Sequence, residues 1–263
     1  MRWLLRDKSF TPKQQISFTF QCIAVLFAGS LLFPFFSPFF LNPNYSKLFF
    51  LALVCGLFGA AFNVLQYVAQ KYLEAGVGGL VRNIYTPITI LLSSFLLHEG
   101  LTPIQIVGTL LLLMSIFIVS KKHRTGKFTF DKYFVLMLLS GVLLSAVLVA
   151  ERELQRVTGF SAGVMLSWGA QAASLGLLAL FIGEKHTYSK KQVLITGGLQ
   201  FLKAFSYVML VWVVGNLSLV TSITTFQVIL LFIAGAVFLK EREDLGIKIF
   251  GSIIAVIGLL LMK

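Results

Sequence analysis

The stretch SSFLLHEGLTPIQIVGTLLLLMSIFIVS (93–120) recurs in altered form as AGAVFLKEREDLGIKIFGSIIAVIGLLLMK (234–263). Each stretch has an apolar segment, a Glu near its end (Glu99 and Glu241), a short polar break, a Gly and a final apolar segment. Upstream, SFTFQ (17–21) matches SWGAQ (167–171) in its Ser, its aromatic residue and its Gln. Similarity that recurs along a chain indicates repeated structural units. The sequence predicts two repeats, over residues 1–120 and 130–263.

Apolar runs fill most of both repeats. Hydrophobic residues make up 57% of the chain and charged residues only 12%, whereas a soluble domain has roughly 45–50% and about 25%. A run of about 20 apolar residues crosses a bilayer as a helix, because only a helix satisfies its own backbone there. We therefore predict an all-α membrane protein with about nine transmembrane helices. The predicted spans are 16–37, 48–69, 77–97, 103–120, 133–150, 161–183, 193–214, 217–239 and 245–262.

The basic residues are distributed unequally between the two sides of this topology. Of the 22 Lys and Arg residues, Arg82 and Lys203 lie inside spans, 16 lie on the side of the N-terminus and four on the opposite side. Basic residues concentrate in cytoplasmic connections, so we expect a cytoplasmic N-terminus and an external C-terminus. Their position in short gaps between apolar runs also argues against a nucleic-acid partner, despite the net charge of +12.

The sequence offers little for catalysis or for a cofactor. The two cysteines, Cys22 and Cys55, lie inside apolar runs, where a lone Cys usually acts as a small buried hydrophobe. The three histidines (His98, His123 and His186) lie at span ends or in connections, and no predicted span contains an Asp. We therefore expect no metal, no cofactor and no enzymatic activity.

In these features the chain resembles the EamA-like branch of the drug/metabolite transporter (DMT) superfamily. Members have two five-helix repeats, and each repeat ends with a Pro-containing helix, a Glu, a tight turn and a helix that begins with Ile-x-Gly. The resemblance covers essentially the whole chain. In the second repeat, Ile229 stands where the proline would be. The matching residues are Pro87, Glu99 and Ile106–Gly108 in the first repeat, and Glu241 and Ile249–Gly251 in the second.

One helix of the family pattern is missing. The span predicted at 133–150 has no counterpart before 16–37, so we expect four helices in the first repeat and five in the second. The chain is then either an N-terminally shortened member or a natural nine-helix variant. Ten-helix members usually have both termini in the cytoplasm, whereas the charges here place the C-terminus outside, and both possibilities stay open.

The resemblance also implies a function. An odd number of helices per repeat gives the two halves opposite orientations, which is the inverted-repeat design of many secondary transporters. We therefore expect alternating access for a small organic solute, in a bacterial inner (plasma) membrane. The 26 Phe residues leave a lipid-linked or multidrug flippase or exporter as the alternative. A membrane-embedded enzyme or a channel is the alternative of another class.

Ionisable residues inside spans are costly and are therefore candidates for a binding site. Lys203 lies near the middle of its predicted span, with Tyr207 four residues on along the same face. Arg82 lies just inside its span, close to Tyr85 and Pro87. Either cation would suit an anionic or zwitterionic solute. The alternatives are a side chain that reaches back to the interface or a structural pair with another helix.

Uncharged polar residues provide a second set of candidates. Asn63, Gln66 and Tyr67 form one polar stripe on an otherwise apolar span. Gln171 and Trp168 occupy places in the second repeat that correspond to Gln21 and Phe18 in the first. Contacts with the solute and hydrogen bonds between helices explain these residues about equally well.

Three consecutive charged residues, Glu151, Arg152 and Glu153, follow the span predicted at 133–150. We interpret them as a solvated charged rim at the end of that helix. The alternative is a pair of proton-coupling carboxylates.

Overall fold

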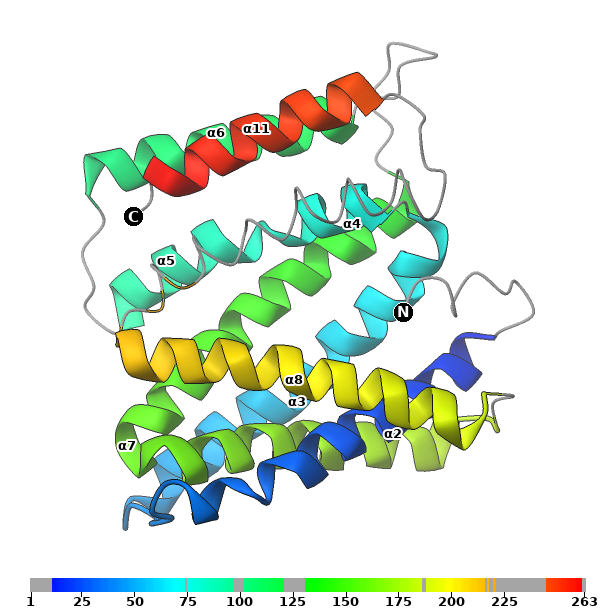
Figure 1. The fold of residues 1–263 in the computed structure, drawn as a ribbon, viewed down its shortest axis with the longest axis vertical. Helices are drawn as coiled ribbons and strands as arrows, with labels where there is room; N and C mark the ends of the chain where they lie inside the picture. The colour runs from blue at the N-terminus through cyan, green and yellow to red at the C-terminus, as the bar shows by residue number, and fades with distance from the viewer. Residues whose placement is uncertain are drawn as a thin grey trace. The chain divides into compact units, whose positions relative to one another are not determined.

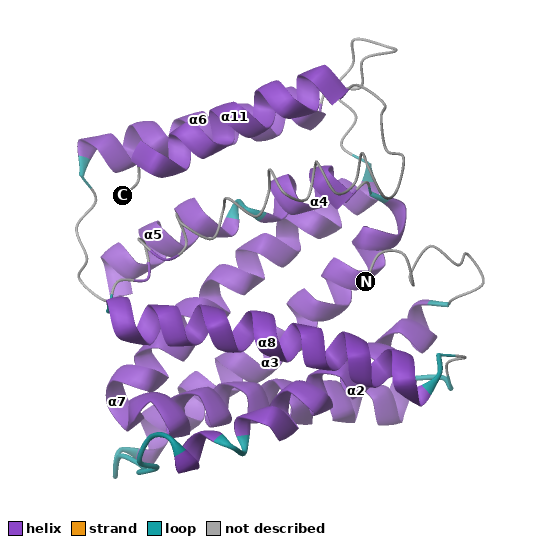
Figure 2. Ribbon diagram, viewed as in Figure 1, coloured by secondary structure: helices purple, strands orange, loops and turns teal. Residues whose placement is uncertain are grey.

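The computed structural model of the protein describes residues 11–73, 75–96, 102–120, 131–185, 188–215, 217, 220 and 245–261. Within these ranges the chain is helical and contains no strand (Figure 2). Most of the predicted span 217–239 lies outside the described residues, as do Glu99, Glu241 and the three histidines.

Nine helical elements are described. Four candidate spans are long and apolar enough to cross a membrane: Pro12–Phe35, which joins the first two elements, Tyr45–Tyr72, Lys132–Ile182 and Lys190–Val214. The predicted all-α membrane class is thereby confirmed, while the count of nine spans and the division into four and five remain predictions. The elements are α2 (Pro12–Ser30), the 3-10 helix η1 (Phe33–Phe35), α3 (Tyr45–Tyr72), α4 (Ala75–Arg82), α5 (Tyr85–Leu96), α6 (Pro103–Ser120), α7 (Lys132–Ile182), α8 (Lys190–Val214) and α11 (Leu245–Leu261).

The 51 residues of α7 are too long for one crossing. At 1.5 Å per residue they extend about 76 Å, more than twice the roughly 30 Å hydrocarbon core. The helix is interrupted at Gly159, whose φ of 80° and ψ of 176° are open to glycine but strained for other residues. A connection predicted at 151–160 is therefore wrong, because helix continues to the single-residue break at Gly159. We call residues 132–158 the first limb and residues 160–182 the second limb.

The predicted span 77–97 is also interrupted, by a turn at Asn83 and Ile84 between α4 and α5. Pro87 lacks the N–H that would reach back to the carbonyl of Asn83. Instead, the Thr86 N–H donates to that carbonyl at 3.0 Å. The proline thus accounts for a change in the hydrogen-bond ladder at this point.

The chain divides into two compact units. Unit 1 contains the described residues of Asp7–Tyr67 and Ala146–Gly215, and unit 2 contains those of Val68–Ser145 and Asn216–Lys263. Each unit therefore takes helices from both predicted repeats. The repeats at 1–120 and 130–263 remain a prediction about the sequence, and the compact units cut across them.

In unit 1, small residues let helices α2 and α3 approach the second limb of α7. A Cβ on Gly56 of α3 would lie 2.7 Å from the Ser174 hydroxyl and 3.0 Å from the Ala170 carbonyl. On the α2 side, Gly169 receives the ring of Phe27. Helices in membranes associate closely where such residues face one another.

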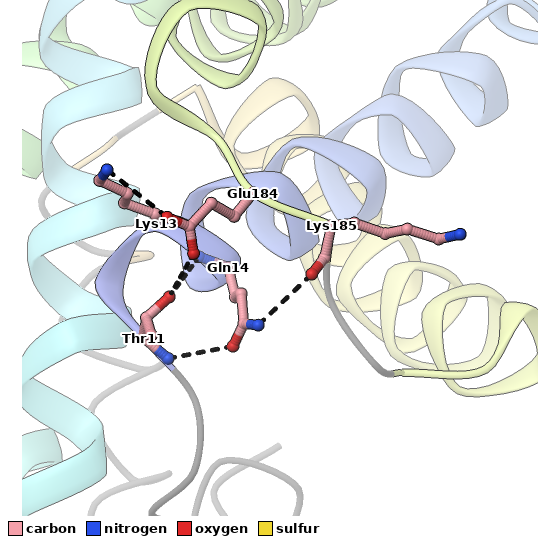
Figure 3. Close-up of polar contacts among 5 residues, drawn as sticks. All are labelled: Thr11, Lys13, Gln14, Glu184 and Lys185. Carbon is pink, nitrogen blue, oxygen red and sulfur yellow. Dashed lines mark hydrogen bonds and ion pairs between the residues drawn. The ribbon is translucent and has the colours of Figure 1, made fainter.

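The start of α2 is joined to the connection between α7 and α8 (Figure 3). Thr11 and Gln14 form a capping box, in which the side chain of each residue bonds the backbone N–H of the other. The Thr11 hydroxyl also donates to Glu184 at 3.3 Å, and Lys13 forms an ion pair with Glu184 at 3.4 Å. The Gln14 amide donates to the carbonyl of Lys185 at 3.4 Å. These exposed contacts orient the end of the helix and add little stability individually.

In unit 2, α6 and α11 lie side by side (Figure 1). They are the last helices of the two predicted repeats. A Cβ on Gly258 would lie 2.7 Å from the Gly108 carbonyl oxygen and 3.0 Å from Leu111 Cβ. Because backbone cannot yield as a flexible side chain does, this contact requires glycine.

We expect Gly258→Ala to destabilise the protein, by about 1–3 kcal/mol, since the added methyl group overpacks the α6–α11 contact. Gly246→Ala is the matched control on the same helix, because a Cβ there meets nothing within 4 Å. Thermal unfolding in detergent measures both variants. Equal melting temperatures for the two variants would contradict the packing described here.

Candidate functional site

Four side chains of unit 1 form a chain of hydrogen bonds inside the helix bundle. Ser167 donates to the Glu151 carboxylate at 2.5 Å, and the Gln171 amide donates to the Ser167 hydroxyl at 3.2 Å. The Asn63 amide of α3 lies 3.5 Å from the Gln171 amide oxygen and donates to the Gly59 carbonyl at 2.8 Å. All four side chains are buried. We call Asn63, Glu151, Ser167 and Gln171 the buried polar cluster.

Glu151 is 5% exposed, so its assignment to a solvated rim is wrong. Its side chain points into the bundle, where the Trp168 indole is a further hydrogen-bond partner. Glu153 does form charged contacts, with Lys47 at 2.6 Å and Arg156 at 3.7 Å. Glu151 and Glu153 therefore lie on different faces of the helix, although only Arg152 separates them in sequence.

The break at Gly159 explains why Glu151 meets Ser167. Both residues lie eight positions from the break, on opposite limbs, which is about 12 Å along each helix axis. The limbs approach closely near the break, since a Cβ on Gly163 would lie 2.6 Å from the Gln155 backbone nitrogen. Folding back at one residue thus sets the register of the two limbs.

A hydroxyl group anchors the same turn to the end of α2. Ser161 Oγ lies 3.0 Å from the Phe33 carbonyl oxygen and 2.8 Å from that of Ser37. These carbonyls belong to η1 and the turn after it, where Pro34 and Pro38 prevent a regular helix. The Phe33 carbonyl also accepts from the backbone N–H groups of Phe36 and Ser37, so the Ser161 hydroxyl ties the α7 turn to a segment that already has its own backbone hydrogen bonds.

Gly59 makes room for Gln171. A Cβ at this position would collide with the Gln171 side chain. The adjacent Ala60 is also buried, against Ala172 and Leu175 of the second limb. Small residues on α3 therefore allow a long polar side chain of α7 to lie beside Asn63.

The predicted polar stripe on α3 is divided in the structure. Asn63 and Tyr67 are each 2% exposed, and Gln66 is half-buried. The Tyr67 hydroxyl donates to the amide oxygen of Gln200 on α8 at 2.9 Å. Two members of the stripe thus bond to two different helices, α7 and α8.

Trp168 connects the buried polar cluster with a group of aromatic rings. Its ring centroid lies 5.7 Å from that of Phe33 and 6.2 Å from that of Phe201. Phe33 also contacts Phe160 and Phe205, at 5.3 Å and 5.4 Å. We call Phe33, Phe160, Trp168, Phe201 and Phe205 the aromatic cluster. Tyr207 packs against this part of the core.

Lys203 on α8 is exposed and therefore does not belong to the buried polar cluster. Tyr207, on the next turn, is half-buried. Lys203 and Tyr207 thus lie one turn apart on α8, as expected, but the Lys203 side chain is exposed and the Tyr207 side chain is partly buried.

Unit 2 contains a second group of polar residues, at the interruption between α4 and α5. Asn83, Thr86 and Thr89 are each 0% exposed, and Tyr85 is 4% exposed. Among the described residues, the Asn83 amide and the two threonine hydroxyls have no hydrogen-bond partner. Arg82 is half-buried beside them. Thr89 was not identified from the sequence, although its spacing of three from Thr86 puts both hydroxyls on one helix face.

The described residues contain no group of three or more His, Cys, Asp or Glu side chains that could hold a metal ion. Uncharged hydrogen-bonding groups and one buried carboxylate are the chemical groups that this part of the protein offers.

We expect Ser167→Ala to destabilise unit 1, because it removes the short hydrogen bond to Glu151 and the acceptor of Gln171. A hydrogen bond to a charged group is worth about 1.5–3 kcal/mol. Ser206→Ala is the control, since this exposed hydroxyl bonds only the Leu202 carbonyl of its own helix. Thermal unfolding in detergent compares the two. A loss no larger in Ser167→Ala than in Ser206→Ala would contradict the role assigned to Ser167.

Comparison with known proteins connects this architecture to a family. A solved crystal structure, described only as that of a protein, is 19% identical and matches 99% of this chain and 89% of its own, with a TM-score of 0.60. That likeness concerns the fold alone. The search of curated proteins finds no match. Residues 9–121 match the model of the EamA-like transporter family. The resemblance inferred from the repeated sequence is thus supported over residues 9–121, and together with its long apolar helices this match shows that the chain is an integral membrane protein similar to the EamA-like transporters.

Proposed function

We propose that the protein is a secondary transporter of a small organic solute that works by alternating access between its inverted repeats. The family of residues 9–121 consists of membrane transporters. The observation that carries the proposal is the buried polar cluster, which lies on two helices apolar enough to span a membrane.

The polar side chains of the buried polar cluster lie in apolar helices, where inserting a polar group into the bilayer is unfavourable. Asn63, Gln171 and Glu151 would each be unfavourable against lipid, and each is buried in protein instead. A hydrogen bond between membrane helices stabilises their association by well under about 2 kcal/mol on average. Helix association alone therefore explains poorly why this many polar groups lie in these helices. A binding site for a polar solute accounts for them better.

The solute is expected to be anionic or zwitterionic. Lys203 on α8 and Arg82 on α4 are cations within predicted spans, and either would suit such a solute. Tyr67 and Gln66 are further candidates in unit 1 for orienting such a solute, and Tyr85 is a separate candidate in unit 2.

A flippase or multidrug exporter is the second candidate, and the aromatic cluster favours it. Five aromatic residues pack together in the core of unit 1, and such rings would suit a bulky apolar cargo if the helices opened. The two candidates differ in whether Lys203 contributes to recognition.

The transport function is tested by counterflow in liposomes. Purified protein is reconstituted into vesicles loaded with unlabelled solute, and uptake of the radiolabelled form is measured for amino acids, monocarboxylates and dicarboxylates. Counterflow needs no ion gradient, so it detects a carrier whatever its coupling. We expect saturable exchange of at least one class. Folded protein that exchanges none of them would count against a metabolite carrier, and single-channel current would favour a channel.

We expect Lys203→Met to reduce exchange of an anionic or zwitterionic solute at least tenfold, which corresponds to about 1.4 kcal/mol. Lys190→Met is the control, because Lys190 is an exposed residue at the start of the same helix. Counterflow rates and thermal stability are measured for both variants. Unchanged exchange in Lys203→Met would support the apolar-cargo alternative instead.

A further inference from the structure

Glu151 is the one acidic residue of the described ranges that is buried. Asp131 and Glu184 are exposed, and Glu153 is half-buried within its ion pairs. Glu151 lies about 12 Å along the helix from the break at Gly159, in a helix that contains candidate membrane spans. Its burial separates Glu151 from Arg152 and Glu153, its neighbours in sequence.

No cation neutralises Glu151 within the described part of the chain. Lys47 and Arg156 pair with Glu153 instead. The Arg152 guanidinium donates to the Gly215 carbonyl at 3.1 Å. From α3, the titratable group that faces Glu151 is the thiol of Cys55, which is itself buried. The second limb contributes Ser167 and Trp168, neither of which carries charge.

A buried carboxylate without a cation is unfavourable in its ionised form by several kcal/mol, and it is neutralised by binding a proton. The groups around Glu151 can hydrogen-bond to both the ionised carboxylate and the protonated carboxylic acid. A serine hydroxyl can donate to a carboxylate or accept from a carboxylic acid, since it has one donor and two acceptor positions. Ser167 can therefore remain bonded to Glu151 when the proton arrives, by reversing the direction of their hydrogen bond.

The cluster links this group to three parts of unit 1. Gln171 extends the hydrogen bonds to Asn63 on α3, and Trp168 packs edge-on against the Phe201 ring of α8. One turn from Glu151, toward the break, the Gln155 amide oxygen is buried and has no partner among the described residues. Uptake of a proton by Glu151 thus alters hydrogen bonds that join the two limbs of α7 and continue to Asn63 on α3.

We propose that Glu151 is a proton-binding site whose loading and release drive transport. One O–H bond forms when the carboxylate takes a proton from one side of the membrane, and the same bond breaks when the proton leaves to the other side. No other covalent bond changes. This inference rests on the proposed function, because a coupling proton requires a carrier to drive.

The proton site itself is tested without any solute. In a background with Trp3→Phe and Trp212→Phe, Trp168 is the only remaining tryptophan, and it is a hydrogen-bond partner of Glu151. We expect its fluorescence in detergent to titrate with pH, and Glu151→Gln to abolish that titration. Glu153→Gln is the matched control and should retain it. A Trp168 titration that persists in Glu151→Gln would overturn the site.

Coupling is tested in the same proteoliposomes with radiolabelled amino acids, monocarboxylates and dicarboxylates, first by counterflow and then by accumulation under an imposed pH gradient. We expect Glu151→Gln to lower the ratio of gradient-driven accumulation to counterflow at least tenfold relative to the unsubstituted protein, whatever its effect on the rate of counterflow itself. Glu151→Asp, which retains a carboxylate, should preserve both the titration and accumulation, and it serves if the Gln variant does not fold.

The outcomes separate the two proposals. Absence of counterflow in the unsubstituted protein would overturn the transport function and the coupling with it, while Trp168 would still report the proton site. Counterflow with accumulation that survives in Glu151→Gln would leave the transporter intact and overturn only the coupling role of Glu151.

Discussion

The reversal of α7 at Gly159 is the constraint on which unit 1 depends. One residue with positive φ lets a 51-residue helix turn back on itself, and the turn is fastened to η1 by Ser161. The register of the two limbs follows from this reversal. It puts Ser167 opposite Glu151 and presents Gln171 to Asn63 on α3. Without the reversal, the polar side chains of the two limbs would lie far apart along one rod, each in need of another partner.

The membrane class and the family could be predicted from the sequence because they depend on averages and recurrences. One can recognise apolar runs of about 20 residues, and the repeated segments at 93–120 and 234–263, without knowing which side chains are in contact. The end of α8 could be predicted too, since Gly215 adopts the left-handed conformation that closes a helix.

The connection after residue 150 was misplaced for a physical reason. Charged residues usually mark the end of a membrane helix, and Glu151, Arg152 and Glu153 looked like such an end. The helix instead continues through them, because Glu153 forms ion pairs with Lys47 and Arg156 and Glu151 turns inward to Ser167. Which face each residue takes depends on contacts with α3 and with the second limb, and no local pattern records those contacts. Asn63, Gln171 and Trp168 stand out in the sequence as polar or aromatic residues within apolar spans, and their contact with a solute stays a prediction. The sequence does not show that Ser167 joins Gln171 to Glu151.

The single-residue turn at Gly159 also bears on how the chain enters the bilayer. During synthesis the first limb emerges before the second, and a lone carboxylate at the centre of a span costs about 3 kcal/mol on insertion scales. The hydroxyl that bonds Glu151 follows only 16 residues later, with no long connection to be threaded between them. The two limbs can therefore leave the translocon together as a helical hairpin, with the acid already hydrogen-bonded before it meets lipid.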